Sequence, residues 1–254
     1  MRETALVTGA SSGIGEQFAR SLAARGLDLV LVARRADRLQ QLAAELPTST
    51  HVVPCDLTTD AASLPDSVAE LDLEISLLVN NAGFGTSGPF LDHPPERDAE
   101  QVRLNCEAVV TLTHAFLPGM VERRRGGIIN VASTAGMQPI PYESVYAATK
   151  AFAISFTDAL HTELRGSGVR VLAVNPGPVP TEWQQVAGYE EGRVSVVPGA
   201  IPAEQVVSEA LVAYDRGRRS VIPGRAIRWF INATRPAPRP VQLRVTERLY
   251  RPRT

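Results

Sequence analysis

The sequence lacks several features that mark whole classes of protein. Its apolar runs stop well short of the ~20 residues that a membrane-spanning helix needs. Two cysteines, Cys55 and Cys106, are too few for a disulfide framework, which favours a reducing, cytoplasmic location. The four histidines are scattered, with no cysteine or histidine at metal-ligand spacing, so we expect no metal site.

Charge and composition exclude further classes. The 26 Lys and Arg residues nearly balance the 27 Asp and Glu residues, so charge gives no reason to expect a nucleic acid partner. The first residues, Met1 to Thr8, lead straight into an apolar run, and we expect no signal peptide. With 44% hydrophobic residues, the chain has enough apolar material for the core of one soluble domain over residues 1–254.

Short apolar runs alternate with amphipathic stretches. Strands are predicted at 5–7, 29–33, 51–54, 75–79, 127–132, 169–174 and 220–222. Helices are predicted at 18–25, 39–46, 96–123, 146–165 and 203–216, the third of these in one or two segments. Continuously apolar strands separated by helices form parallel sheets that are covered on both faces. We therefore expect an α/β fold with a doubly wound sheet.

A glycine-rich turn, Thr8-Gly-Ala-Ser-Ser-Gly-Ile-Gly15, joins the first predicted strand to the first helix. Its spacing is G-x-x-x-G-x-G, which differs from the G-x-G-x-x-G of other dinucleotide folds. Glycines let the backbone approach a pyrophosphate, and the helix N-terminus supplies N–H groups and a positive dipole end. The turn predicts dinucleotide binding; the alternative is a tight connection with no ligand.

Tyr146 and Lys150 lie four residues apart and so share one face of a predicted helix. A tyrosine has an ordinary pKa of roughly 10, and a neighbouring cation lowers it by stabilising the phenolate. The pair can serve as a proton donor with its own pKa modifier. Taken alone, it can equally be a surface pair on an amphipathic helix.

These motifs together resemble the short-chain dehydrogenase/reductase (SDR) family in its single-domain form. The resemblance covers residues 1 to about 225 and rests on the glycine-rich turn, Asn80-Asn-Ala-Gly83, Asn105, Ser133, the Tyr146/Lys150 pair and Asn175-Pro-Gly177, in that order. It implies a Rossmann-type three-layer sandwich with a seven-stranded parallel sheet in the order 3-2-1-4-5-6-7. It also implies an oxidoreductase that forms a homodimer or homotetramer through the helices at 96–123 and 146–165.

The resemblance assigns four catalytic roles. Tyr146 is expected to be the general acid that protonates the substrate carbonyl oxygen, and Lys150 to lower its pKa and bind the nicotinamide ribose. Ser133 is expected to hold and polarise the carbonyl. Asn105 is expected to hold a water in a proton relay that reaches Lys150. Without the other motifs, Ser133 would be a turn serine and Asn105 a helix-surface amide.

The resemblance also implies the cofactor site. Its residues are Gly9, Ser11, Ser12, Gly13, Ile14, Gly15, Arg34, Arg35, Asp56, Leu57, Asn81, Ala82, Gly83, Tyr146, Lys150, Pro176, Gly177, Val179 and Thr181. Ala33 stands where a site for NAD(H) would carry an acidic residue, and Arg34 follows it. Because a guanidinium offers two-pronged hydrogen bonds to phosphate, we predict NADP(H) rather than NAD(H). The alternative is a solvated basic helix start, whose charge Asp37 partly offsets.

The substrate pocket is expected to be lined by residues 83–90, by residues 135–142 and by a flap at 182–198 within the loop 178–200. Four side chains there, those of Phe84, Met137, Trp183 and Tyr189, suggest an apolar pocket, although each can also be ordinary packing. The substrate inferred from them is a neutral or lipophilic carbonyl compound or its secondary alcohol.

The C-terminal extension, residues 226–254, departs from the family pattern. Its last twenty residues hold six arginines and one glutamate. The spacing of Val241, Val245 and Leu249 predicts a short amphipathic helix packed on its own domain or on a partner subunit. The alternatives are a partly disordered basic tail and, less favoured because the apolar face is small, attachment to an anionic membrane surface.

Two other functions stay open. One is an epimerase or dehydratase of the extended branch of the superfamily, although such chains carry a larger C-terminal substrate domain. The other is a cofactor-binding regulator or scaffold without catalysis. The joint presence of Ser133, Tyr146, Lys150 and Asn105 argues against a regulator, which needs no proton donor.

Overall fold

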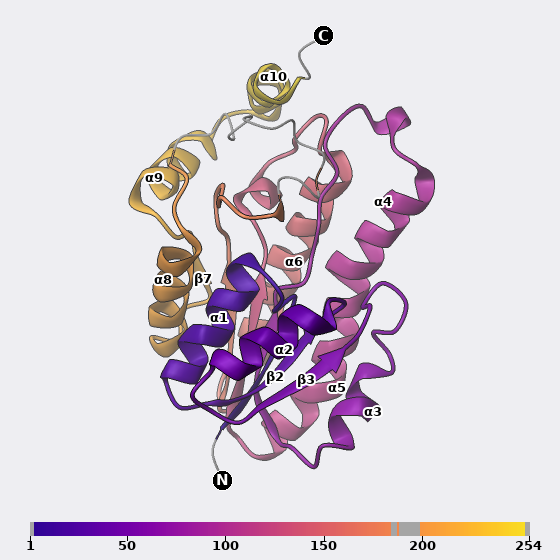
Figure 1. Cartoon of the computed structure of the whole chain (residues 1–254). Helices are drawn as coiled ribbons and strands as arrows, with labels where there is room; N and C mark the ends of the chain where they lie inside the picture. Colours follow the sequence, from indigo (N-terminus) through magenta and orange to yellow (C-terminus); the bar gives the residue numbers. More distant parts are fainter. Residues whose placement is uncertain (1–2, 184–186, 188–198, 252–254) are drawn as a thin grey trace.

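A computed structural model of the chain describes residues 3–183, 187 and 199–251. In this part of the chain one parallel sheet has seven strands in the order β3-β2-β1-β4-β5-β6-β7, which confirms the predicted topology (Figure 1). The strands are β1 (Thr4–Thr8), β2 (Asp28–Ala33), β3 (Thr50–Pro54), β4 (Ile75–Asn80), β5 (Gly126–Val131), β6 (Val169–Val174) and β7 (Ser220–Val221).

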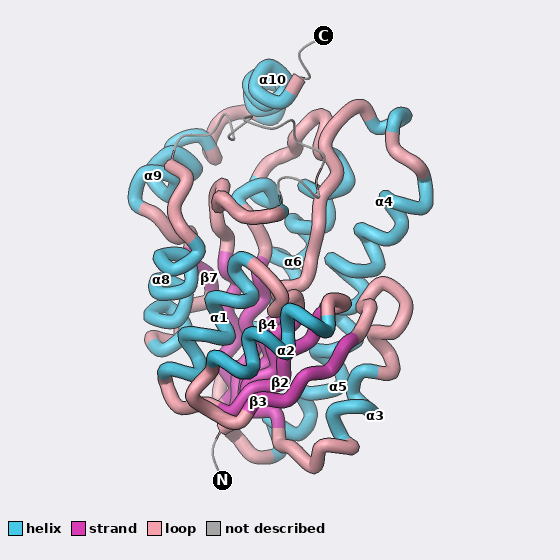
Figure 2. Tube along the Cα trace, viewed as in Figure 1, coloured by secondary structure: helices cyan, strands magenta, loops and turns pink. Residues whose placement is uncertain are grey.

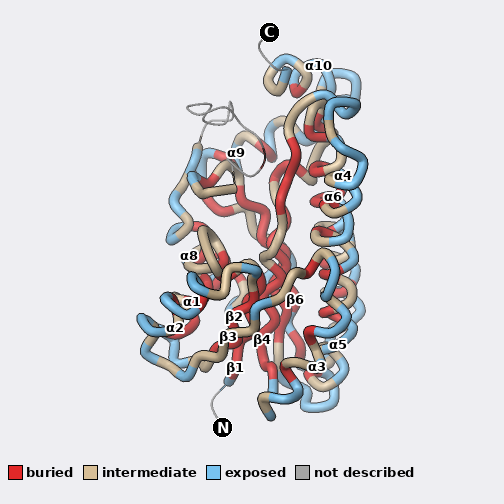
Figure 3. Tube along the Cα trace, turned by 45° about the vertical axis from the view of Figure 1, so that its right-hand side comes forward, coloured by how far each residue is buried: buried red, intermediate tan, exposed pale blue. Residues whose placement is uncertain are grey.

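Helices cover both faces of the sheet (Figure 3). One face carries α1 (Gly13–Ala24), α2 (Ala36–Glu45) and α8 (Ala203–Asp215), and the other carries α3 (Leu64–Ala69), α4 (Pro95–Val102), α5 (Ala108–Glu122) and α6 (Ser144–Glu163). Short turns lie at η1 (Phe90–Asp92), η2 (Arg103–Glu107) and η3 (Thr134–Met137), and α9 (Arg225–Thr234) and α10 (Arg239–Tyr250) end the described chain. Of the α-helices, the sequence did not predict α3 and α9.

The central strands are mostly apolar because both of their faces are buried. Val7 and Leu31 pack into the core under α1, α2 and α8, whereas Leu6 and Val30 pack into the core under α3, α5 and α6. All four side chains are fully buried. Since successive side chains of a strand point to opposite faces, a parallel sheet between two helical layers favours apolar residues on both faces of its strands.

A short chain of polar side chains crosses the core beside α6. Asn80 donates to Asn130 Oδ1 at 2.9 Å, and Asn130 donates to Thr157 Oγ1 at 2.9 Å. The Thr157 hydroxyl donates in turn to the Ala153 carbonyl. Each of these side chains is at least 96% buried, so every one depends on its neighbour for a hydrogen bond.

Replacing Thr157 by valine is expected to lower the free energy of unfolding by about 1–3 kcal/mol, because the Asn130 amide then loses its buried acceptor. Urea unfolding followed by circular dichroism measures this loss. Thr162→Val is the matched control, since Thr162 lies exposed on the same helix. Its effect is expected to stay within about 0.5 kcal/mol. Equal losses for the two variants would contradict the role assigned to Thr157.

The C-terminal extension ends in a helix, as predicted, but the face that packs on its own domain is not the predicted one. Val241 and Val245 are each 47% exposed, whereas Thr246 is 2% exposed. The Thr246 hydroxyl lies within hydrogen-bonding distance of the Pro139 carbonyl at 3.2 Å and of the Gln242 carbonyl at 2.8 Å. With its hydroxyl satisfied, this threonine is buried without penalty, and α10 packs on the domain through it.

The position of α10 matters for the site. It lies at the opposite end of the molecule from the start of β1, and loops occupy the space between it and the sheet (Figure 2). The preceding helix α9 buries Ile227 and Ile231 and leaves Trp229 73% exposed. In the described part of the chain, no helix has both the length and the hydropathy to cross a bilayer.

Candidate active site

A cavity of about 410 Å³ lies at the carboxyl ends of the strands. Its walls come from the loops that follow β1 to β6, together with side chains from α6, α9 and α10. This edge is where an open parallel sheet presents its ligand crevice, because all of its strands end on the same side.

Most of the residues predicted from the sequence line this cavity. They are Gly9, Ser11, Ser12, Gly13, Ile14, Arg34, Arg35, Asp56, Leu57, Asn81, Ala82, Gly83, Ser133, Tyr146, Lys150, Pro176, Gly177, Val179 and Thr181. Two of the predicted residues, Gly15 and Asn105, do not line it. A Cβ on Gly15 would lie 2.2 Å from the Gly9 carbonyl oxygen, so its missing side chain lets α1 pack against the turn.

The glycine-rich turn forms a narrow cradle. Gly9 and Gly13 adopt positive φ of 65° and 59°, which L side chains rarely tolerate. A Cβ on Gly13 would lie 3.0 Å from the Thr181 Cγ2 atom, so the loop after β6 closes over the turn. Ser12 precedes α1 without a side-chain cap, which leaves the N-terminal N–H groups of this helix for an anion. The cradle therefore fits the pyrophosphate of a dinucleotide.

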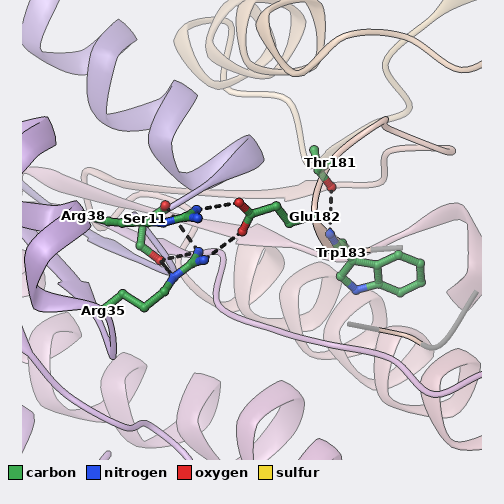
Figure 4. Close-up of polar contacts among 6 residues, drawn as sticks. All are labelled: Ser11, Arg35, Arg38, Thr181, Glu182 and Trp183. Carbon is green, nitrogen blue, oxygen red and sulfur yellow. Dashed lines mark hydrogen bonds and ion pairs between the residues drawn. The ribbon is translucent and has the colours of Figure 1, made fainter. Parts of the chain in front are cut away.

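Two arginines beyond the end of β2 meet a carboxylate from the loop after β6 (Figure 4). Arg35 donates to Ser11 Oγ at 3.0 Å and to Glu182 Oε2 at 2.8 Å, and Arg38 donates to Glu182 Oε1 at 2.5 Å. The two hydrogen bonds that Glu182 accepts lower the pKa of its carboxyl, and the bond from Arg38 has the larger effect. The sequence pointed to Arg35, but no motif indicated that Glu182 would contact it.

Arg34 lies beside Asp56, another residue of the predicted cofactor site. Its side chain is 68% exposed, and its Nη1 atom is 3.8 Å from Asp56 Oδ2. Asp56 Oδ1 accepts bonds from the Thr58 N–H and hydroxyl at 3.0 and 2.7 Å, which orient the carboxylate. Because its side chain is exposed and only weakly paired with Asp56, Arg34 is the arginine best placed to bind a new anionic group.

Tyr146, Lys150 and Ser133 come together at the centre of the cavity. The Ser133 hydroxyl hydrogen-bonds the Tyr146 phenol and also accepts the Ala135 N–H at 3.1 Å. Lys150 donates to the Val131 carbonyl at 2.9 Å, and its Nζ lies 5.8 Å from the centre of the Tyr146 ring. A serine, a phenol and an ammonium thus converge from η3 and from one face of α6.

Burial determines the protonation states of Tyr146 and Lys150. It raises the pKa of Tyr146, which the bond from Ser133 partly offsets. It lowers the pKa of Lys150 to about 8. Burial therefore outweighs the lowering of the tyrosine pKa that we expected from Lys150, and Tyr146 holds its proton at neutral pH.

Asn105 lies one layer behind the cavity, on the π-helical turn η2. Its amide donates to the Phe84 carbonyl at 2.9 Å and to Thr149 Oγ1 at 3.0 Å, and its Oδ1 accepts the Phe84 N–H at 3.3 Å. A Cβ on Gly83 would lie 2.9 Å from this Oδ1 and 3.3 Å from Lys150 Nζ. The Asn105 side chain thus anchors the loop after β4 to α6, and its water-relay role stays a prediction.

A family model described as short chain dehydrogenase matches residues 3–191, more than half of the chain. The chain belongs to the short-chain dehydrogenase family. The very-long-chain 3-oxoacyl-CoA reductase of Bos taurus is 36% identical over 192 residues, which cover 72% of this chain and 62% of the bovine protein. The chain therefore spans less than two thirds of the length of that relative.

Solved structures of short-chain dehydrogenases agree with this fold over nearly the whole chain. A short-chain dehydrogenase from Sphingobium yanoikuyae in complex with NADPH has a TM-score of 0.81 and 36% identity, covering 92% of this chain and 94% of its own. A bulky-bulky ketone specific alcohol dehydrogenase from Comamonas testosteroni has a TM-score of 0.75 and 32% identity, covering 91% of each chain.

The substrate side of this short-chain dehydrogenase is partly as predicted. Phe84 and Trp183 line the cavity, Met137 does not, and Tyr189 lies outside the described residues. The centre of the Trp183 ring lies 5.0 Å from that of Tyr146. Gln138 and Ile140 line the cavity within the predicted stretch 135–142, whereas Glu143, Phe230, Ile231 and Tyr250 line it without having been predicted. Those from α9 and α10 follow no family motif, so only their proximity in the fold reveals them.

Glu143 is the unexpected charged group in this wall. It is 3% exposed, and its Oε1 atom has no hydrogen-bond partner in the described part of the chain. Burial raises its pKa to about 8. No group of three or more His, Cys, Asp or Glu side chains in the described ranges is arranged to hold a metal ion.

The raised pKa of Glu143 predicts a pH-dependent stability. Between its ordinary pKa of 4.5 and about 8, the folded state binds more protons than the unfolded state, so stability falls as pH rises. Glu143→Gln removes this dependence and is expected to gain at least about 1 kcal/mol on the parent across that window.

Urea unfolding at several pH values measures this difference. Below pH 8, the lowered pKa of Lys150 contributes little, because its effect acts between about 8 and 10.5. Glu163→Gln, at the exposed end of the same helix, is the control. If the two variants follow the same pH curve, Glu143 is not a buried acid in solution.

Proposed function

We propose that the chain is an NADP(H)-dependent oxidoreductase that transfers a hydride between the nicotinamide and a neutral or lipophilic carbonyl compound or its secondary alcohol. The observation that carries this proposal is the Tyr146 phenol, hydrogen-bonded by Ser133 and backed by Lys150 in the same cavity as the glycine-rich turn. A cofactor-binding scaffold needs none of these three side chains in that cavity.

The residues of the chain have distinct tasks in this reaction. When bound, the cofactor supplies or accepts the hydride. Ser133 offers its hydroxyl to the carbonyl oxygen and so holds the substrate against Tyr146. Tyr146 keeps its proton at neutral pH, since burial raises its pKa, and delivers it to the oxygen as negative charge develops there. Lys150 keeps a positive charge beside the phenol, which stabilises the phenolate left behind.

The arginines after β2 support NADP(H) over NAD(H). Arg34 and Arg35 line the cavity at the position where a carboxylate would repel a 2′-phosphate. Arg38 lies next to them through its bond to Glu182. The Sphingobium yanoikuyae relative, solved with NADPH, supports the same choice.

Aromatic and aliphatic side chains support a lipophilic substrate. Phe84, Trp183, Phe230 and Ile231 surround the space in front of Tyr146. One solved neighbour is named for bulky ketones and one curated relative for a long-chain 3-oxoacyl thioester, both of which carry a carbonyl beside apolar carbon. A ketone with a sizeable apolar part fits the same description.

The proposal includes pairing of subunits. Val102, Val121 and Phe152, on α4, α5 and α6, are 37–46% exposed on one side of the domain. Exposed apolar side chains on neighbouring helices support a homodimer or homotetramer through this side.

Tyr146→Phe is expected to lower kcat for ketone reduction by at least about 100-fold, because it removes the proton donor. NADPH binding, measured by fluorescence titration, is expected to stay within a few-fold of the parent, since the ring is kept. Absorbance of NADPH over a panel of ketones measures turnover. Turnover retained by this variant would remove Tyr146 from its role. Tight NADPH binding by the parent chain with no turnover on any ketone would favour a regulator.

Arg34→Asp is expected to weaken NADPH binding by about tenfold or more while changing NADH binding little, because a carboxylate repels the 2′-phosphate and accepts a 2′-hydroxyl. Dissociation constants for both cofactors, measured by calorimetry, give the selectivity. Equal losses for both cofactors would count against this assignment.

Glu182→Gln is expected to change NADPH binding in the opposite direction in the same assay. It releases Arg35 and Arg38 from a competing carboxylate, so NADPH binding is expected to tighten and NADH binding to change less. A variant that weakens NADPH binding would show that Glu182 helps to place the arginines instead.

A further inference from the structure

The N-terminal end of α6 carries a carboxyl group that the fold does not use. Glu143 immediately precedes this helix, three residues before Tyr146, and both side chains line the cavity. The charge of Glu143 also raises the pKa of Tyr146, so the carboxyl lies within electrostatic reach of the phenol. Its Oε1 has no hydrogen-bond partner among the described residues.

The backbone at Tyr142, immediately before Glu143, adopts a strained conformation. Tyr142 has a φ of 69°, in a region that residues other than glycine rarely adopt. The Gly88 N–H donates to the Tyr142 carbonyl at 2.8 Å, and the Glu143 N–H donates to the Ile140 carbonyl at 3.2 Å. Such strain persists where the surrounding structure requires it, and it clusters at binding sites. Here it keeps the Glu143 side chain in the cavity wall.

A tyrosine from the C-terminal helix lies against the same group. Tyr250 packs with Tyr146, Ile140 and Trp183 in one small apolar cluster. The bond between Thr246 and the Pro139 carbonyl holds α10 against the loop that leads to Glu143. Burial raises the pKa of Tyr250, and the charges of Glu143 and Tyr146 raise it further, so the three groups lie within electrostatic reach.

A buried carboxyl without a partner is costly, because it loses its hydrogen bonds to water and gains none. A ligand that supplies the missing hydrogen-bond partner removes this free-energy cost. In its ionised form the carboxyl repels an anionic ligand group, and an apolar group leaves Oε1 unsatisfied. A group that donates a hydrogen bond would satisfy it, and a cation would also lie against the rings of Tyr146, Trp183 and Tyr250.

We propose that Glu143 and Tyr250 form a polar subsite that binds a hydrogen-bond-donating group, a hydroxyl or an ammonium, carried by the substrate a few carbon atoms from its carbonyl. This inference rests on the proposed reduction at Tyr146 and specifies which ketones the site prefers. The apolar walls take the carbon skeleton, and the subsite selects among skeletons by their second functional group.

Matched ketones test the proposal, because each donor can be compared with a hydrocarbon of the same shape. For the hydroxyl, 4-hydroxy-2-butanone is compared with 2-pentanone. For the ammonium, 4-(dimethylamino)-2-butanone is compared with 5-methyl-2-hexanone. Two readouts are taken for each ketone: kcat/KM with NADPH, and the dissociation constant for the NADP⁺-bound protein, in which no hydride can move.

The parent protein is expected to prefer at least one donor ketone over its hydrocarbon partner by about tenfold or more in both readouts. Glu143→Leu is expected to abolish that preference. Glu143→Gln still accepts a bond from a hydroxyl but cannot pair with a cation, so it separates the two donors. Tyr250→Phe is expected to reduce the preference in part, and Glu163→Leu, on the exposed end of α6, to leave it unchanged.

The outcomes separate the subsite from the reaction. No preference in the parent, or a preference that Glu143→Leu leaves intact, overturns the subsite even if every ketone is reduced. A Glu143-dependent preference in binding, with no ketone reduced, supports the subsite and overturns the proposed reaction. If Glu143→Leu does not fold, Glu143→Gln and Tyr250→Phe decide the question: a preference untouched by both overturns the proposal.

Discussion

A parallel sheet brings the carboxyl ends of all its strands to one edge, and the candidate site depends on this constraint. The glycine-rich turn follows β1, the arginines follow β2, Asp56 follows β3, and Ser133 follows β5. These residues are far apart in the sequence and meet because the strands point the same way. The central strands that create this edge are buried on both faces, so most of the polar groups of the site come from the loops that follow the strands.

Burial at this edge then sets the chemistry of the side chains. It raises the pKa of Tyr146 and lowers that of Lys150, which in each case favours the neutral form. This suits the proton donor that we propose, because the phenol would keep its proton until negative charge develops on a substrate oxygen. Glu143 is subject to the same effect, and its pKa of about 8 makes it a neutral acid or a carboxylate depending on what binds beside it.

The sequence predicts the parts of this site that depend on local order along the chain. A turn between a strand and a helix, or a Tyr and a Lys four residues apart, are properties of short segments, and the structure brings them together as expected. It does not predict the face of α10, because the burial of Thr246 depends on a carbonyl at Pro139, more than a hundred residues away. Nor does it predict that the Asn105 amide is used by the Phe84 backbone, since that pairing arises from the packing of η2 on the loop after β4.

The loop after β6 joins the two halves of the site within three consecutive residues. Thr181 lies against Gly13 of the turn, and Trp183 packs against Tyr146. Between them, Glu182 pairs with Arg35 (Figure 4). Thr181, Glu182 and Trp183 share one short backbone segment. A phosphate that binds Arg35 in place of Glu182 therefore also changes the forces on Thr181 and Trp183. The charge of Glu182 and the ring of Trp183 are therefore coupled through the backbone.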